Sequence, residues 1–118
     1  MQSPIGRCAI AHYDALLMIP TQILLSAYRQ GVFPMAHPNG ELAWYSPDPR
    51  GVLPLREFHI PHGTRRALRR HKFEVRVNTA FDDVMNGCAS RPETWIDSRI
   101  KSSYAALHQI GYAHSVET

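Results

Sequence analysis

Four arginines are spaced so that a single helical face would carry all of them. They stand at i, i+1, i+4 and i+5 in the segment HGTRRALRRH, where we expect a helix over residues 62–71: Arg65, Arg66, Arg69 and Arg70. Like charges one turn apart repel by roughly 0.2–0.5 kcal/mol per pair, so the pattern is unfavourable without a bound anion. Guanidinium groups match phosphate oxygens in geometry. The spacing therefore favours a phosphate-binding face, and a solvated basic face is the alternative.

The charge of the chain is unevenly distributed. Over 118 residues the formal net charge is only +3, yet the stretch from His59 to Arg76 is rich in Lys and Arg and has Glu74 as its one acid. This asymmetry points to a phosphate-bearing partner more than to a membrane. No stretch approaches the roughly 18 consecutive apolar residues of a membrane span. The length suits one ordinary domain.

Aromatic side chains are the second group that could bind a ligand. A ring that stacks on a nucleic-acid base contributes on the order of 1–3 kcal/mol. Core packing is the alternative for most of these rings, and Phe33 and Trp95 are the exceptions because each stands at the edge of a predicted loop. The group comprises Tyr28, Phe33, Trp44, Tyr45, Trp95 and Tyr104.

Reactive groups form no recognisable catalytic or metal-binding set. The seven histidines are scattered and lack acidic or thiol partners at ligand spacing. Cys8 and Cys88 form no CxxC pattern, which fits a reducing cytoplasm, with a single disulfide as the alternative. Cys88 lies in the apolar stripe of a predicted helix and is expected to be buried. The residues alone therefore indicate a basic α+β domain that handles RNA or a nucleotide.

The first half of the chain is predicted to form a compact α+β unit. Residues 1–18 lack periodicity and are expected to be partly disordered. A helix should begin at Thr21 and end at Gly31, followed by an extended stretch and an Asn-Gly turn at residues 37–40. Two short strands are expected to flank a proline-rich loop, at residues 42–45 and 51–55.

The second half is predicted to continue with mixed elements. The arginine helix comes first, and alternation over residues 73–78 predicts a half-buried strand. One helix should run from Thr79 through Cys88. Another should be capped by Asp97 or Ser98 and end at Gly111. A further strand is expected to start at Tyr112.

An ordered set of motifs carries a family resemblance. It runs from about Ile19 to Glu117 and consists of AYRQGVFPM, WYSPDPRGVLPL, FHIP, TAFDDVMNGCAS, ETWI and YAALHQIGYAHSVE. Together these motifs resemble the leucyl/phenylalanyl-tRNA–protein transferases. The resemblance implies a small N-terminal α+β domain over residues 1–58. It further implies that residues 59–118 are the first part of an acetyltransferase-like (GNAT-type) domain that carries the basic tRNA-binding helix.

The resemblance also implies an activity. Such proteins are aminoacyl-tRNA–protein transferases of the bacterial N-end rule pathway, and they are cytoplasmic. They move leucine or phenylalanine from charged tRNA to the α-amino group of proteins that begin with Arg or Lys. The implied partners are therefore aminoacylated tRNA and such acceptor proteins, with no DNA, membrane, metal or diffusible cofactor.

Residue by residue, the resemblance implies two binding regions and no catalytic side chain within this chain. The aminoacyl-adenosine pocket would include Tyr28, Phe33, Met35, Trp95 and Tyr104, with Met35 where many members have a tryptophan. The acceptor stem of the tRNA would contact Arg65, Arg66, Arg69 and Arg70, and also His62, where an arginine is common.

The family pattern continues beyond the motif HSVE with segments that hold the acceptor peptide. The resemblance therefore leads us to expect a C-terminally truncated chain that lacks the acceptor-peptide site and is inactive alone. A non-catalytic tRNA-binding fragment is the alternative function, and an unstable remnant without activity is a third.

Overall fold

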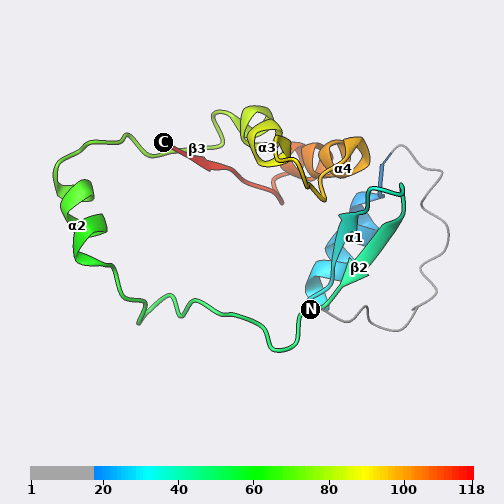
Figure 1. The fold of residues 1–118 in the computed structure, drawn as a ribbon, viewed down its shortest axis with the longest axis horizontal. Helices are drawn as coiled ribbons and strands as arrows, with labels where there is room; N and C mark the ends of the chain where they lie inside the picture. Colours follow the sequence, from blue (N-terminus) through cyan, green and yellow to red (C-terminus); the bar gives the residue numbers. More distant parts are fainter. Residues whose placement is uncertain (1–17) are drawn as a thin grey trace.

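The structure is a computed structural model that describes residues 18–118. This part of the chain contains four helices and two two-stranded antiparallel sheets, β1–β2 and β3–β4 (Figure 1). In chain order the elements are α1 (Thr21–Arg29), β1 (Phe33–Ala36), β2 (Leu42–Tyr45), α2 (His62–Arg69), β3 (Arg76–Val77), α3 (Phe81–Ala89), α4 (Ser98–Gln109) and β4 (Val116–Glu117). The predicted α+β class is confirmed, and the acetyltransferase-like assignment stays a prediction. The expectation for residues 1–17 lies outside the described residues.

Local signals at the end of α1 position the first hairpin. Gly31 adopts a φ of +73°, which L side chains rarely accept, and its N–H donates to the Tyr28 carbonyl at 3.0 Å. The chain then turns into β1, which pairs with β2 so that Phe33 lies opposite Tyr45. Gly40, at φ +86°, closes the predicted turn between these strands.

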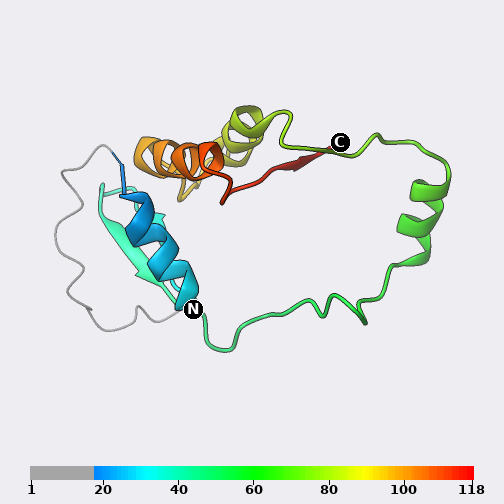
Figure 2. The ribbon, with the colours of Figure 1, turned by 180° about the vertical axis from the view of Figure 1, so that it is seen from behind.

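One hydrophobic core joins the first elements of the described chain to α4. Its buried members come from before α1, from α1, from β1 and from α4 with the loop before it: Ile19, Leu24, Ala36, Ile96, Ile100 and Leu107. The buried Ser103 hydroxyl adds two hydrogen bonds to this core. It accepts from the Ile19 N–H at 2.7 Å and donates to the Arg99 carbonyl at 2.6 Å. Figure 2 shows α1 and its hairpin beside α3 and α4 as one body. The boundary at residue 58 remains a prediction.

The N-cap of α4 offers a measurable local contribution to stability. Asp97 Oδ1 accepts from the Ile100 N–H at 2.9 Å, and Oδ2 pairs with the Arg99 guanidinium at 2.7 Å. Asp97→Ala is expected to lower the free energy of unfolding by about 1 kcal/mol in a urea titration. Asp97→Asn retains the cap acceptor and should lose clearly less. Equal losses would show that the ion pair, and not the cap, stabilises this helix start.

The arginine helix α2 lies apart from this body. The chain leaves β2, runs through an extended segment to α2, and returns to β3 on the other side (Figures 1 and 2). None of the α2 residues is buried. The helix therefore presents most of its surface to solvent.

Two predicted strands differ from the structure. Residues 51–55 are exposed and form no strand, because no other strand lies beside them in the described chain and Pro54 lacks a backbone donor. The predicted half-buried strand 73–78 is reduced to β3 and is exposed, since its partner β4 is only two residues long.

The prediction that Cys88 is buried is also wrong, because its thiol is exposed. The stripe of α3 that faces the core follows every fourth residue through Phe81, Met85 and Ala89. Cys88 precedes Ala89 by one residue and is therefore rotated about 100° away from this stripe.

Candidate nucleic-acid interface

The basic side chains of α2 lie together, as their spacing predicts. All four arginines and His62 line one hollow of about 350 Å³ on the surface of the helix, and Arg70 contributes as the residue that caps the C-terminus of α2. Within residues 18–118 none of the four arginines forms an ion pair, since the carboxylate bridges there involve Arg76 and Arg99. Four guanidinium groups on one exposed face are thus available to an anion from outside the chain.

Two of the predicted pocket tyrosines contact one another between α1 and α4. Tyr28 on α1 and Tyr104 on α4 form a hydrogen bond between their hydroxyls, and their rings meet edge to face with centroids 6.3 Å apart. Burial, together with the Tyr28 hydroxyl, raises the pKa of Tyr104 far above its ordinary value. Tyr104 therefore stays neutral at physiological pH, while Tyr28 remains 47% exposed.

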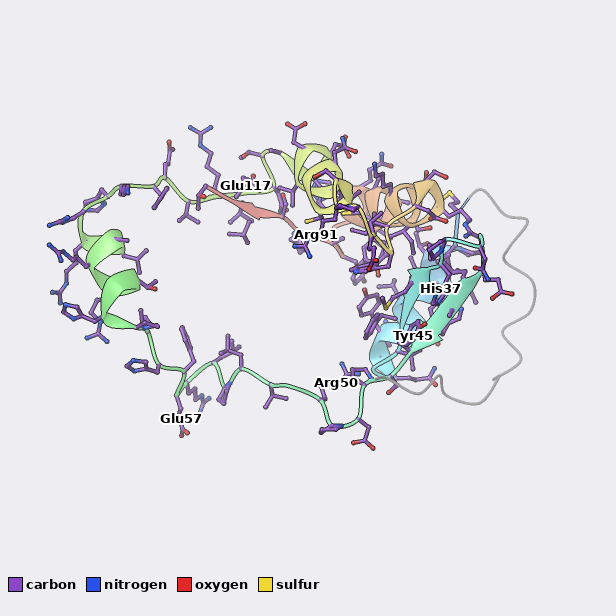
Figure 3. All side chains as sticks on the ribbon, in the orientation of Figure 1. His37, Tyr45, Arg50, Glu57, Arg91 and Glu117 are labelled. Carbon is purple, nitrogen blue, oxygen red and sulfur yellow. The ribbon has the colours of Figure 1, made fainter. Side chains whose placement is uncertain are left out.

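The hairpin carries a second aromatic group (Figure 3). Phe33 stacks on Tyr45 with ring centroids 6.4 Å apart, and the Tyr45 hydroxyl lies 2.7 Å from His37 Nε2. Met35 is two residues from Phe33 on β1, so both side chains project from the same face of the strand. Trp44 packs against the hydrophobic core. The ring of Tyr45 thus braces Phe33 within the hairpin.

Trp95 is held close to this hairpin by its backbone. Its carbonyl accepts from the Ala36 N–H at 3.0 Å, which places the loop before α4 against the end of β1. The indole is 42% exposed. All five predicted pocket residues therefore belong to the body formed by α1, β1–β2 and α4. Helix α2 lies on the opposite side of the open chain loop (Figure 1).

A carboxylate contact escaped prediction from the sequence. Glu117 Oε1 accepts from the Thr79 N–H at 2.6 Å, from the Thr79 hydroxyl at 2.5 Å and from the Ala80 N–H at 3.1 Å. A negative charge beside the first turn of α3 is favourable. The partners are 38 residues apart in sequence, and no local pattern links them. This contact fastens β4 to the start of α3.

The Glu117 contact predicts a pH dependence. The hydrogen bond from the Thr79 hydroxyl lowers the pKa of Glu117 in the folded protein. The ionised Glu117 carboxylate therefore stabilises the fold fully at pH values above its pKa in the unfolded chain, and this stabilisation is lost as the pH falls through the lowered pKa. We expect the protection of the Thr79 and Ala80 amides, measured relative to intrinsic exchange at each pH, to fall over that acidic range. Glu117→Gln should accelerate their exchange at neutral pH, and Glu57→Gln, a change at an exposed carboxylate, should not. Exchange that is insensitive to Glu117→Gln would contradict the contact.

Neither a metal-binding cluster nor a membrane-spanning helix is found among the described residues. Residues 18–118 contain no group of three or more His, Cys, Asp or Glu side chains placed to hold a metal ion. Over the same residues, no helix combines the length and apolarity that a membrane crossing requires.

The fold and site define a mixed helix–strand protein with a basic helical face suited to phosphate. The family described as leucyl/phenylalanyl-tRNA protein transferase matches residues 52–118, and its N-terminal domain matches residues 18–48. The chain therefore belongs to the leucyl/phenylalanyl-tRNA–protein transferase family.

Similar curated proteins carry the same name, leucyl/phenylalanyl-tRNA–protein transferase. The relative from Akkermansia muciniphila is 52% identical over an alignment of 101 residues that covers 81% of this chain and 52% of the relative. The Salinibacter ruber relative is 51% identical over 96 residues, covering 80% and 42%. The relative from a Synechococcus species is 50% identical over 97 residues, covering 80% and 50%. The chain thus spans about half the length of the curated relatives it matches.

Proposed function

We propose that this chain supplies the tRNA-binding part of an aminoacyl-tRNA–protein transferase of the bacterial N-end rule pathway. In this proposal leucine or phenylalanine passes from charged tRNA to the α-amino group of cytoplasmic proteins that begin with Arg or Lys. The observation that carries it is the set of unpaired guanidinium groups on the exposed face of α2, in a chain that belongs to this family.

The basic face would bind the phosphates of the tRNA acceptor stem. Arg65, Arg66, Arg69 and Arg70 offer planar forks that suit phosphate oxygens, and such contacts fix the position of the RNA without reading its sequence. His62 lies at the start of the same hollow, and its ring N–H could donate to a phosphate oxygen. The exposure of α2 leaves room for an RNA helix beside it.

The aromatic residues would receive the terminal adenosine and its aminoacyl group. Tyr28 and Tyr104 offer paired hydroxyls, Met35 and Trp95 offer apolar surface, and Phe33 is braced by Tyr45. In the transfer, the acceptor nitrogen forms a bond to the ester carbonyl carbon. The bond from that carbon to the ribose oxygen breaks, and the ribose oxygen takes up a proton. Because the ester is already activated, correct positioning supplies much of the rate.

A second candidate function is tRNA binding without transfer. It is favoured by the exposed basic face at α2, which can contact phosphates whether or not transfer follows. A transfer assay with leucyl-tRNA and a peptide that begins with Arg separates the two functions. Turnover by this chain alone supports the enzyme, and binding without turnover supports the fragment.

The proposal is tested by measuring tRNA affinity against salt. We expect the logarithm of the affinity for leucyl-tRNA to fall linearly with the logarithm of salt concentration. If all four arginines contact phosphates, the slope should lie between about −2.8 and −3.6, at roughly 0.7–0.9 per contact. Affinity that does not change with salt would contradict the proposed interface.

A further inference from the structure

A hydrogen bond on the first hairpin joins His37, which the proposed function does not use, to Tyr45. The Tyr45 hydroxyl lies 2.7 Å from His37 Nε2, and the centroids of the two rings are 6.0 Å apart (Figure 3). The same Tyr45 ring stacks on Phe33, with the two ring planes 29° apart. Tyr45 therefore contacts both His37 and Phe33, and Phe33 belongs to the proposed aminoacyl-adenosine pocket.

The backbone around His37 constrains the position of its imidazole. The His37 N–H donates to the Glu41 carbonyl at 2.8 Å, and the His37 carbonyl accepts from the Gly40 N–H at 2.9 Å. Pro38 follows directly, and the residue before a proline is restricted to extended conformations. Asn39 strengthens the turn, because its Oδ1 accepts from the Glu41 N–H at 3.1 Å. The turn thus presents the imidazole from a backbone of defined conformation.

The Tyr45 ring is only partly enclosed by its surroundings. It is half-buried at the end of β2, in a sheet of two strands. A side chain that packing does not enclose can exchange between staggered rotamers. The bond to His37 holds the ring at its hydroxyl, which is the end farthest from the backbone, and this bond therefore restricts both side-chain torsions of Tyr45.

We propose that His37 is a positioning residue for the aminoacyl-adenosine pocket, an inference that rests on the proposed function. Its imidazole holds the Tyr45 hydroxyl and so keeps the Tyr45 ring stacked on Phe33 in the free protein. The aminoacyl-adenosine end of the tRNA then binds without the entropic cost of immobilising these rings. His37 acts through Tyr45 and needs no contact of its own with the ligand.

Binding of a stable analogue of the charged tRNA end tests this role. In the analogue, an amide at the 3′ position of adenosine replaces the ester to phenylalanine, and its affinity for the full chain is measured by calorimetry. We expect His37→Ala to weaken binding about three- to tenfold, because a side chain must then be immobilised on binding. His37→Gln should recover most of the affinity, since an amide can both donate and accept a hydrogen bond.

Tyr45→Phe removes the other partner of the hydrogen bond and retains the ring. Its affinity for the analogue should fall about as far as that of His37→Ala. The variant with both changes should bind no more weakly than either single variant, because the two changes remove the same interaction.

Asn39→Ala is the matched control in the same turn. It removes the bond to the Glu41 N–H and leaves both His37 and Tyr45 unchanged. We expect its affinity for the analogue to equal that of the unaltered chain. If His37 merely stabilised the hairpin, Asn39→Ala would weaken binding as well.

The hydrogen bond itself is measured without the ligand, from the nitrogen resonances of the His37 imidazole. Tyr45→Phe should shift the Nε2 resonance. The proposal is overturned if that resonance does not move, if His37→Ala binds the analogue as tightly as the unaltered chain, or if Asn39→Ala weakens binding equally. Failure of the unaltered chain to bind the analogue would contradict the proposed pocket itself, and the role of His37 with it.

Discussion

Reversal of the four charges on α2 is expected to abolish measurable tRNA binding. Each change to Glu removes one phosphate contact and adds a repulsive charge, so we expect the affinity to fall at least about 100-fold at low salt. The slope of affinity against salt should also flatten, because fewer counterions would be released. The helix should persist, since Glu has a helix propensity close to that of Arg. The substituted residues are Arg65, Arg66, Arg69 and Arg70.

A variant with the same change of net charge separates a specific face from a general attraction. It carries Glu in place of exposed arginines outside α2, at positions 29, 56, 76 and 91. We expect a much smaller loss, because long-range attraction is screened over about 8 Å at physiological salt. The tRNA affinity of both variants is measured by fluorescence anisotropy with labelled tRNA. Equal losses of affinity in the two variants would contradict an interface on α2.

Ile100→Ala is expected to have the largest effect on stability. The Ile100 side chain is 1% exposed at the centre of the core, where α4 meets the residues around α1. Removing its buried carbons should lower the free energy of unfolding by about 2–5 kcal/mol, as transfer and cavity costs combine. Because this core also holds Tyr28 beside Tyr104, the loss should disturb the proposed adenosine pocket.

Ile110→Ala provides the matched control immediately after the same helix. Ile110 is 54% exposed, so its truncation should change the free energy of unfolding by less than about 0.5 kcal/mol. Urea titrations followed by far-UV circular dichroism measure both variants. Similar midpoints for the two would show that Ile100 does not sit in a shared core.

Elements with strong local signals could be predicted from the sequence. The glycines that end α1 and α4, the Asn-Gly turn and the Asp97 cap all lie where the residue types require them. Strands were less predictable because each needs a partner. Residues 51–55 have the composition of a strand, yet no strand lies beside them among the described residues.

In the candidate site, too, the features set by local sequence could be predicted and those set by tertiary packing could not. Clustering on α2 follows from helical periodicity, which is a local property, so residues 62–70 could be placed correctly. The contact between Tyr28 and Tyr104 spans 76 residues, and the Glu117 contact spans 38, so both depend on tertiary packing. The family resemblance identified the two tyrosines without indicating that their hydroxyls would meet.

The decisive measurement is the reactivity of each arginine toward phenylglyoxal, with and without bound leucyl-tRNA. If the RNA lies on α2, residues 65, 66, 69 and 70 become protected while Arg56 and Arg91 react as before. Uniform protection, or protection confined to arginines outside α2, would show that the tRNA binds elsewhere.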